Sequence, residues 1–585
     1  MCLRWEVPSS LGSRCTLARL RTGRRRRPRS KSHHTGSHRG AGRLGRVTEQ
    51  LHGGFGVSRA LRALGVQHLF TLSGGHIFPV FDACQQDGVR IVDVRHEQTA
   101  GYAAEGWARL TRSIGVAAVT AGPGVTNSIS PIAQASFNGA PVLVLGGRAP
   151  MFRWGQGSLQ EMDHAPVVAP LATTMTVTDT SRIAAEVVAA ARVAMTPPRG
   201  PAFLDFPLDV LFSTAEISVP EPAAMSDPRV DTDGIEHVAR LIHEAERPVV
   251  VAGSNVWMDR AETKLQTLAE SARLPVFMNG GGRGCLAADH ALAFARSRSQ
   301  ALRECDLVMV AGTPLDFRLG FGGNFGPDAK IVHLDSSPDL IAEHVPLAAG
   351  VGGALDRLLG ALTEAVDPVP DRREWIDHLR STETAKTDVA QTELRSSARP
   401  IHPLRVYGEV VPLLDRDAVV IGDGGDFVSY AGKEVPSYEG GRWLDPGPFG
   451  CLGCGPGYSM AARLAHPDSQ VVLLYGDGAI GFGGMELEAL VRHKLPVTCI
   501  VGNNGIWGLE KHPMRALYGY DVAAELRPGI RYDRMMEAFG GGGELVDDPD
   551  ELGPALKRAL DSGEPYLVNV LTDPEIAYPR SAVLA

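Results

Sequence analysis

Residues Val471 to Asn504 read VVLLYGDGAIGFGGMELEALVRHKLPVTCIVGNN and contain two apolar runs joined by a glycine-rich connection. The β-branched run from Val471 to Tyr475 predicts a buried strand that ends in a glycine turn, and the run from Pro496 to Val501 predicts a second strand. The connection includes a helical pattern from Met485 to His493. We therefore predict one βαβ unit, in which both strands end on the same edge of a parallel sheet.

Polar side chains stand at the end of each predicted strand. Asp477 follows the first strand and Asn504 follows the second, so a carboxylate and an amide oxygen should meet at the sheet edge. Mg²⁺ prefers one or two protein oxygens and completes its octahedron with phosphate oxygens and water. The glycines at 478, 481, 483 and 484 would let a diphosphate approach backbone N–H groups at a helix start. The stretch thus predicts a site for Mg²⁺ and a diphosphate.

The segment resembles the thiamine diphosphate motif, which opens with Gly-Asp-Gly and closes with Asn-Asn after a spacer of similar length. A Gly-Asp-Gly turn alone also follows strands in unrelated parallel α/β proteins. Gly422-Asp423-Gly424 is a second such turn, but Phe449-Gly450 stands where its asparagine pair would fall. The resemblance implies that Mg²⁺ is held by Asp477, Asn504 and Ile506. It also implies cofactor contacts from Gly424, Gly425, Gly476, Asp477, Gly478, Ala479, Asn504 and Ile506.

Length and composition predict a multidomain α/β protein. The 585 residues exceed one hydrophobic core and suggest about three domains of 150 to 200 residues. A hydrophobic content of 44% with 21% charged residues is ordinary for such proteins, and no apolar run approaches the length of a membrane span. Among the eight scattered cysteines, Cys451 and Cys454 form the only close pair, and no second Cys/His pair lies nearby to complete a zinc site. We predict a reducing, cytoplasmic compartment.

The first 47 residues differ from the rest in charge. Thirteen Lys and Arg residues precede residue 47, against the single acid Glu6. Such blocks are typical of disordered extensions, and this one could also imitate a transit peptide or a nucleic-acid arm. We predict a dispensable basic extension and no nucleic-acid partner.

Beyond this extension, strands and helices alternate, which predicts three doubly wound parallel-sheet domains. The predicted bounds are 48–217, 234–366 and 401–575. They are separated by a Pro-rich polar linker from Pro220 to Asp233 and by a charged, partly helical stretch from about Asp367 to Pro400. The resemblance implies that these are a pyrimidine-binding, a central and a diphosphate-binding domain.

Glu97 is the predicted catalytic residue. It lies near the start of a predicted helix from His96 to Thr111, which resembles the glutamate helix of the same family. Alanines at 100, 103, 104 and 108 should let this helix pack tightly and bury the carboxyl group, which favours its protonated form. The resemblance implies that Glu97 exchanges a proton with N1′ of the cofactor's aminopyrimidine, while the cofactor serves as the electron sink. For Glu97 alone, a solvated acid at a helix start is the alternative.

Two other segments are implicated by the resemblance. Residues Phe449 to Gly455 match a glycine-flanked site for a large apolar side chain, which places Leu452 under the bend of the cofactor and Gly450 at its aminopyrimidine. Gln160 falls in a further cofactor-contacting segment. Asp426 departs from the family pattern, because relatives often have Gln-His or Ala-Asn in this loop and a carboxylate beside a diphosphate is unfavourable.

Over residues 48 to 575 the chain resembles the acetolactate synthase family, including its 2-hydroxyacyl-CoA lyase branch. The first reading implies decarboxylation of pyruvate or another 2-oxo acid and transfer of the two-carbon unit to a second 2-oxo acid, as in branched-chain amino acid biosynthesis. The alternative implies cleavage of a 2-hydroxyacyl-CoA to an aldehyde and formyl-CoA. An alternative of another class is a catalytically silent interaction protein with the same fold. By overall resemblance we predict the synthase reaction.

Some residues favour the lyase branch. Synthases usually carry a tryptophan where this chain has Pro513, and the segment from Leu315 to Gly322 departs from their flavin-contacting stretch. Arg296 and Arg298 could meet a phosphate of CoA or ADP, or be solvated. Whether the central domain binds FAD is therefore left open. Relatives bind the cofactor between subunits, which implies a homodimer or homotetramer.

Overall fold

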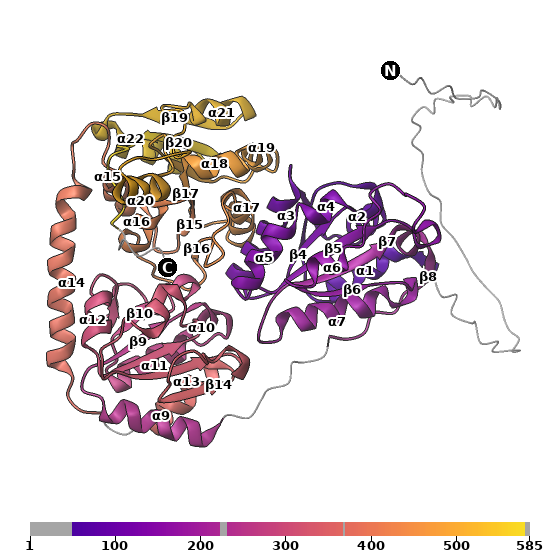
Figure 1. Cartoon of the computed structure of the whole chain (residues 1–585). Coiled ribbons are helices and arrows are strands. Elements are labelled where there is room, and N and C mark those ends of the chain that lie inside the picture. Colours follow the sequence, from indigo (N-terminus) through magenta and orange to yellow (C-terminus); the bar gives the residue numbers. More distant parts are fainter. Residues whose placement is uncertain (1–49, 223–230, 367–368, 580–585) are drawn as a thin grey trace, which may run out of the picture. The chain divides into compact units, whose positions relative to one another are not determined.

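The computed structural model describes residues 50–222, 231–366 and 369–579. The predicted basic extension and most of the predicted linker from Pro220 to Asp233 lie outside the described residues. Three six-stranded sheets, all with parallel pairing, form the framework, each covered by helices (Figure 1). The predicted fold class is confirmed.

The first domain, predicted to be pyrimidine-binding, is built on a sheet of order β3-β2-β4-β5-β7-β6. A short antiparallel pair, β1 with β8, lies beside it. Its strands are β1 (Gln50–His52), β2 (His68–Thr71), β3 (Arg90–Asp93), β4 (Gly115–Val119), β5 (Val142–Arg148), β6 (Thr173–Thr176), β7 (Ala202–Pro207) and β8 (Thr214–Glu216). Its helices are α1 (Gly53–Ala63), α2 (Phe78–Asp87), α3 (Glu97–Thr111), α4 (Pro123–Thr126), α5 (Ile129–Phe137), α6 (Ala165–Val168), α7 (Ile183–Met195) and α8 (Leu208–Phe212).

The central domain has the sheet order β11-β10-β9-β12-β13-β14. Its strands are β9 (Pro248–Ala252), β10 (Val276–Met278), β11 (Ala293–Phe294), β12 (Leu307–Ala311), β13 (Lys330–Asp335) and β14 (Ala349–Gly352). Its helices are α9 (Thr232–Glu244), α10 (Ser254–Met258), α11 (Glu262–Ala272), α12 (Arg298–Glu304) and α13 (Leu355–Ala365).

The last domain, predicted to be diphosphate-binding, has the sheet order β16-β15-β17-β18-β20-β19. Its strands are β15 (Val419–Asp423), β16 (Trp443–Leu444), β17 (Val471–Gly476), β18 (Thr498–Asn503), β19 (Gly542–Val546) and β20 (Tyr566–Leu571). Its helices are α15 (Pro403–Val410), α16 (Asp426–Glu434), α17 (Gly455–Ala465), α18 (Asp477–Gly483), α19 (Leu487–Arg492), α20 (Gly508–Tyr518), α21 (Tyr532–Phe539) and α22 (Pro549–Asp561).

The predicted βαβ unit is present, with one difference in its helix. β17 and β18 are parallel neighbours, and Gly476 pairs with Gly502. The connection is not one helix from Met485 to His493. It begins at Asp477 as α18, passes through a 3₁₀ turn at Gly484–Glu486 and continues as α19. The glycines after Asp477 therefore lie inside a short helix rather than in an open loop.

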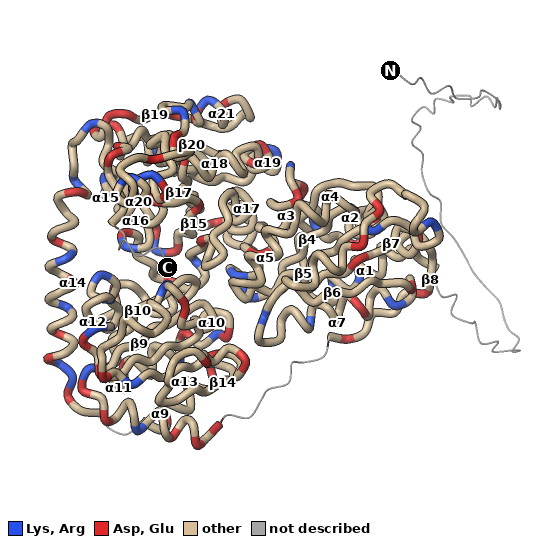
Figure 2. The backbone as a smooth tube through the Cα atoms, viewed as in Figure 1, with Lys and Arg blue, Asp and Glu red and all other residues tan. Residues whose placement is uncertain are grey.

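The charged stretch between the last two domains forms a single long helix, α14 (Arg373–Leu394). Acidic and basic residues are interspersed along it (Figure 2). Glu383 of α14 accepts hydrogen bonds from backbone N–H groups after β11, and Arg380 donates to the carbonyl of Ala293. The helix is thus fastened to the edge of the central sheet. None of the described helices is both long enough and apolar enough to cross a membrane.

Helices α3 and α17 pack in parallel and join the first domain to the last. A Cβ on Gly457 would stand 2.9 Å from the Cβ of Tyr102, and one on Gly106 would stand 2.9 Å from the Tyr458 ring. Glycine at both positions allows this close approach. Both helix starts therefore lie at the same end of the contact, with Glu97 at the first residue of α3 and Cys454 at the N-cap of α17.

Candidate active site

Three neighbouring strands end side by side and carry the polar residues of the site. Asp423 is the last residue of β15, Asp477 follows β17 and Asn504 follows β18. The three strands are adjacent and parallel in the sheet, so their carboxyl ends share one edge. Ligands of open α/β sheets bind at this edge.

The structure brings Asp477 and Asn504 together. One carboxylate oxygen of Asp477 accepts a hydrogen bond from the N–H of Gly505 at 2.7 Å, and the other accepts from the N–H of Gly478 at 2.8 Å. Oδ1 of Asn504 accepts from the N–H of Ile506 at 3.2 Å. The three predicted metal ligands thus lie within one hydrogen-bonded turn. Their coordination of Mg²⁺ stays a prediction.

The electrostatics of this turn suit a cation. Burial, together with the nearby Asp426 carboxylate, raises the pKa of Asp477 to about 7 against the opposing effect of the backbone hydrogen bonds. Asp477 and Asp426 form no ion pair with a Lys or Arg among the residues that the structure describes. Burying a carboxylate without a counter-charge is costly, so a divalent cation would offset that cost.

The donor set also fits Mg²⁺ in kind. Within the described ranges, no three His, Cys, Asp or Glu side chains gather into a metal cage. The available donors are a carboxylate, an amide and a backbone carbonyl, all hard oxygens that leave room for phosphate and water. Cys451 and Cys454 are both unbridged thiols, and burial raises the pKa of each.

Asp426 turns toward the asparagine rather than away from the site. Its Oδ2 accepts a hydrogen bond from Nδ2 of Asn504 at 3.2 Å, and its Oδ1 accepts from the N–H of Phe427 at 2.8 Å. Gly508 gives it space, because a Cβ there would stand 2.1 Å from Oδ2. With its amide nitrogen held by Asp426, Asn504 presents its oxygen to the turn. Asp426 therefore orients a predicted ligand, a role that the sequence left in doubt.

Two glycines of the site are required by geometry. Gly424 has a φ of +146°, and a Cβ on it would meet the nitrogen of Gly476 at 2.9 Å. A Cβ on Gly478 would lie 2.5 Å from the ring of Trp507. These positions let the β15 and β17 turns approach each other and let the Trp507 ring lie against the start of α18. Ala479, next in α18, is fully buried.

Glu97 is the first residue of α3, and its side chain is only 7% exposed. The predicted burial against alanines is found, since Ala100, Ala103 and Ala104 are fully buried. Oε2 of Glu97 accepts a hydrogen bond from Nδ2 of Asn127 at 3.0 Å. No hydrogen bond to Oε1 comes from the part of the chain that the structure describes, so this oxygen is free to meet a ligand. The sequence analysis assigned no role to Asn127.

The loop that carries Leu452 is held by Asp423, which sequence reasoning used only as a control. The Asp423 carboxylate accepts hydrogen bonds from the N–H groups of Gly453 at 3.0 Å and Gly455 at 2.7 Å. It is fully buried, and burial raises its pKa to about 7. The second Gly-Asp-Gly turn therefore anchors the Leu452 loop. Gly450 has a φ of +74°, and no atom stands within 4 Å of the position of a Cβ.

A buried polar network ties this loop to the first domain. Oε1 of Gln134 accepts a hydrogen bond from the N–H of Cys451 at 3.1 Å. Its Nε2 donates to Glu105 at 3.0 Å and to the hydroxyl of Tyr458 at 2.8 Å. Asn138 donates to the same carboxylate at 2.7 Å. Sequence reasoning missed this network; the one available signal was Glu105, an acid on the alanine-rich face of α3.

Gln160 lies in the first domain, in a loop after β5. It has a φ of +58°, and a Cβ on Gly122, in the turn after β4, would stand 2.9 Å from its own Cβ. The N–H of Gly122 donates to Nε2 of the buried His164 at 3.0 Å, and Nδ1 of that ring bonds Asp205 at 3.0 Å. The turn beside Gln160 is therefore fixed from within the domain. Cofactor binding by Gln160 remains a prediction.

Comparison with known proteins agrees with this geometry. Three family models match: the N-terminal TPP binding domain of thiamine pyrophosphate enzymes at residues 51–167, the central domain at 235–362 and the C-terminal TPP binding domain at 423–570. The acetolactate synthase large subunit IlvG of Mycobacterium tuberculosis is 51% identical over 542 residues, covering 92% of this chain and 98% of the relative. A probable acetolactate synthase of Mycobacterium bovis matches to the same extent.

A second group of relatives is more distant. The 2-hydroxyacyl-CoA lyase 2 of Danio rerio is 32% identical over 569 residues, covering 89% of this chain and 91% of the relative. Both groups of relatives cover about nine-tenths of the chain. With its three sheets, its buried glutamate and its Asp477–Asn504 turn, the chain belongs to the acetolactate synthase family of thiamine diphosphate-dependent enzymes.

Proposed function

We propose that the protein decarboxylates pyruvate or another 2-oxo acid and transfers the two-carbon unit to a second 2-oxo acid, giving an acetolactate-type product for branched-chain amino acid biosynthesis. The observation that carries the proposal is the site itself: a buried Glu97 with one free oxygen and an oxygen-lined Asp477–Asn504 turn in one chain. The 51% identity to a synthase against 32% to a lyase favours the synthase reaction.

In this proposal Glu97 handles the proton at one end of the cofactor. Its carboxyl group would exchange a proton with a ring nitrogen of the aminopyrimidine, and Asn127 would hold the carboxyl group in place. Asn127 directly precedes Ser128 and α5, the helix whose Gln134 meets the Leu452 loop. When bound, thiamine diphosphate supplies the electron sink for cleavage and formation of the carbon–carbon bond.

In the same proposal, the diphosphate end of the cofactor is held by the diphosphate-binding domain. Asp477, Asn504 and the carbonyl of Ile506 would hold Mg²⁺, which would in turn bind the diphosphate. Gly424, Gly425 and the start of α18 offer close backbone approach to its oxygens. Gly450 and Leu452 would contact the aminopyrimidine, and Leu452 packs partly against the buried core.

Loss of the Asp423 anchor should loosen the Leu452 loop. In Asp423→Ala, the N–H groups of Gly453 and Gly455 lose a charged acceptor, so we expect cofactor affinity or turnover to fall by about 10- to 100-fold. Titration of cofactor-dependent activity measures both. The matched control is Asp388→Asn, at an exposed residue of α14. Wild-type affinity and turnover in Asp423→Ala would show that the loop needs no anchor.

The decisive test of the reaction offers two substrates to the enzyme with thiamine diphosphate and Mg²⁺. We expect acetolactate from pyruvate. Formyl-CoA from a 2-hydroxyacyl-CoA, without acetolactate, would instead establish the lyase reaction. The lyase is favoured by Pro513, which lies inside α20 where synthases usually have tryptophan, and by the segment from Leu315 to Gly322. Failure of both assays, with cofactor bound, would support a catalytically silent protein.

We infer a nucleotide-binding crevice in the central domain from its strand order. Its strand order reverses between β9 and β12, and such a reversal opens a crevice at the carboxyl ends of the strands. Gly253 follows β9, and Gly312, with a φ of +69°, follows β12. Arg298 lies beside Arg318, which pairs with Asp316. FAD, ADP or CoA would each bring phosphate to such a crevice, and the visible absorption spectrum of the purified protein distinguishes FAD from the other two.

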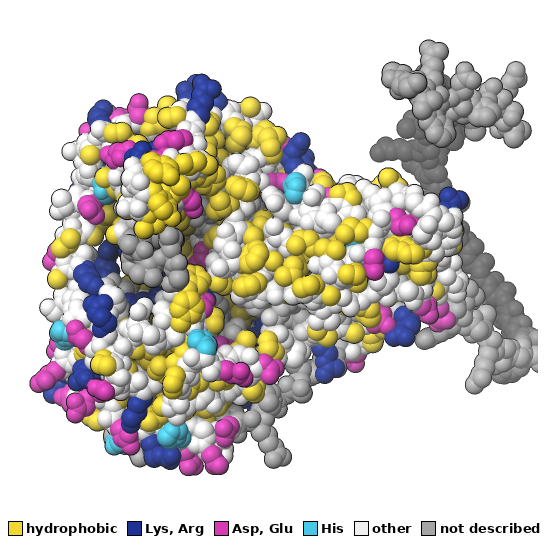
Figure 3. Space-filling view, viewed as in Figure 1, with side chains coloured by type: hydrophobic (Ala, Val, Ile, Leu, Met, Phe, Trp, Pro, Cys, Tyr) yellow, Lys and Arg dark blue, Asp and Glu magenta, His cyan; other side chains and the backbone are white. Residues whose placement is uncertain are grey.

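We further propose a homodimer or homotetramer. Apolar side chains gather on the surface over α18 to α20 and over the first domain (Figure 3). Phe449, Phe482 and Met485, at 42%, 54% and 54% exposure, flank the catalytic edge, and a second copy of the chain would cover them. Light scattering of the holoenzyme reports the mass. The cytoplasm is the proposed compartment, consistent with six unbridged cysteines among the described residues.

A further inference from the structure

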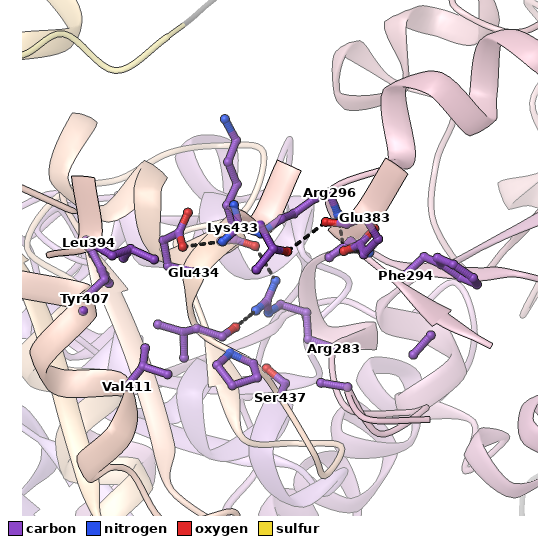
Figure 4. Close-up of a pocket in the computed structure, with 18 of the residues that line it drawn as sticks. Arg283, Phe294, Arg296, Glu383, Leu394, Tyr407, Val411, Lys433, Glu434 and Ser437 are labelled. Carbon is purple, nitrogen blue, oxygen red and sulfur yellow. Dashed lines mark hydrogen bonds and ion pairs between the residues drawn. The ribbon is translucent and has the colours of Figure 1, made fainter. Parts of the chain in front are cut away.

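A large cavity lies away from the catalytic edge, between the central and diphosphate-binding domains (Figure 4). Its volume is about 710 Å³, within the range of sites for small organic ligands. β11 and α14 form one side, and α15 and α16 form the other. Glu97, Asp423, Asp477 and Asn504 are not among its lining residues.

α16 marks the separation of this cavity from the proposed metal turn. The helix begins at Asp426, which contacts Asn504, and ends at Glu434, which lines the cavity. Eight residue steps of an α-helix span about 12 Å. The cavity also lacks Gly253 and Gly312, the residues of the central-domain crevice. Of the residues named above for a nucleotide, only Arg296 lines the cavity, and there it is paired with Glu434. The proposed cofactor sites therefore do not account for the cavity.

Two guanidinium groups in the cavity wall form no ion pair with any residue that the structure describes. Arg283 donates to the carbonyls of Gly432 and Val435, and its Nε is buried without a hydrogen-bond partner among the described residues. Arg380 donates to the carbonyls of Ala291 at 2.7 Å and Ala293 at 3.2 Å. Carbonyl groups satisfy N–H donors but carry no net charge. Asp445 attracts the Arg283 guanidinium without forming an ion pair with it, so both arginines still present a positive charge to the cavity.

Two further basic residues line the cavity. Arg395 is exposed, and the described residues provide no partner for its side chain. The Lys433 ammonium lies 4.6 Å from the centre of the Tyr578 ring, a contact that leaves its charge in place. These two residues can be changed without removing an ion pair.

The acids of the wall are already engaged. Glu434 pairs with Arg296, and Glu409 pairs with Arg405. Glu383 accepts from the N–H groups of Ala295, Arg296 and Ser297, in the turn that starts α12. Figure 4 shows Glu383 and Arg296 on the central-domain side of the cavity and Glu434 on the other. Glu383 has no arginine or lysine partner among the described residues and stays negative, but Arg283, Arg380, Arg395 and Lys433 outnumber it, so the cavity is net positive.

The remaining wall is apolar. It includes Met278, Phe294, Leu394, Val411, Pro412 and Pro436. The Arg380 guanidinium lies 4.0 Å from the centre of the Phe294 ring, so a cation and an apolar surface stand next to each other. We propose that this cavity is a second binding site, separate from the catalytic one, for an organic anion with an apolar body.

The test uses 8-anilinonaphthalene-1-sulfonate, an anion with a flat apolar body, on the full-length holoenzyme saturated with thiamine diphosphate and Mg²⁺. We expect saturable fluorescence enhancement. The double variant Arg395→Glu/Lys433→Glu should weaken binding at least tenfold, because both changes reverse a charge at the cavity. The matched control is Arg192→Glu, at an exposed arginine of α7. Its affinity should equal that of the wild type.

A second variant tests the cavity by volume instead of charge. Gly432 lines the cavity from α16, and no atom stands within 4 Å of the position of a Cβ. We therefore expect Gly432→Trp to fold and its ring to occupy part of the cavity. The affinity for the sulfonate probe should then fall at least tenfold. The uncharged N-phenyl-1-naphthylamine should bind at least tenfold more weakly than the sulfonate. Unchanged sulfonate affinity in both the double variant and Gly432→Trp would overturn the site, and equal affinity for the two probes would overturn its preference for anions.

Discussion

Glu97→Gln is expected to abolish turnover while the cofactor still binds. Glutamine has nearly the same volume and keeps an oxygen that can accept the hydrogen bond from Asn127, but it cannot exchange a proton with a ring nitrogen. Loss of a general acid–base group costs about 10²- to 10⁴-fold in rate, or about 3 to 5 kcal/mol of barrier. Steady-state rates at saturating cofactor, with calorimetric titration of thiamine diphosphate, separate the two effects.

Two further variants sharpen this test. Glu97→Asp keeps the acid but shortens its reach, so we expect a rate between those of the wild type and Glu97→Gln. Glu236→Gln changes an exposed glutamate of α9 and should leave the rate unchanged. A wild-type rate in Glu97→Gln would remove this residue from the mechanism. Equal loss of cofactor affinity and rate would instead make it a structural residue.

The fold could be predicted because its signals are local. Each predicted strand of the Val471–Asn504 stretch is a short apolar run bounded by glycine, and parallel pairing follows from the βαβ connection. The meeting of Asp477 and Asn504 could be predicted for the same reason, because neighbouring parallel strands end at one edge of the sheet. The start of the helix between them was not predicted, because the glycine-rich residues 478 to 483 give no periodic signal, yet they lie in α18.

The supporting residues could not be predicted because they act across long sequence separations. Asp423 holds a loop 30 residues later in the chain, and Gln134 contacts the same loop from 317 residues earlier. Neither contact has a periodicity or a fixed spacing in the sequence. The orientation of the Asp426 side chain could not be predicted either, because it depends on the space left by Gly508. Tertiary contacts of this kind are set by packing, which the sequence pattern does not reveal.

Asp477→Asn is expected to have opposite effects with and without the cofactor. In the free protein, burial raises the pKa of Asp477 from its ordinary value of 3.8 to about 7. The folded state then binds the proton more tightly than the unfolded state, so this group lowers stability as pH rises from about 4 to 7, and the full cost is present above pH 7. Three pKa units correspond to about 4 kcal/mol, reduced by about 1 kcal/mol for the hydrogen bond that the amide cannot accept.

Thermal unfolding in the presence of a chelator measures the first effect. At pH 8 we expect Asp477→Asn to unfold at a higher temperature than the wild type, whereas at pH 5 the difference should shrink. Asp388→Asn, at an exposed aspartate of α14, should follow the wild type at both pH values. A variant that is less stable than the wild type at pH 8 would show that the carboxylate is stabilised without a cation.

Addition of Mg²⁺ and thiamine diphosphate should reverse the order. The wild type should gain stability, because both ligands bind the folded state and the cation offsets the charge of Asp477. The variant keeps an oxygen at this position but loses the negative charge, so Mg²⁺-dependent cofactor affinity should fall at least tenfold. Calorimetric titration measures this loss without reference to activity. Equal affinity in the wild type and the variant would place the metal elsewhere, and with it the diphosphate that Asp477 and Asn504 are proposed to hold.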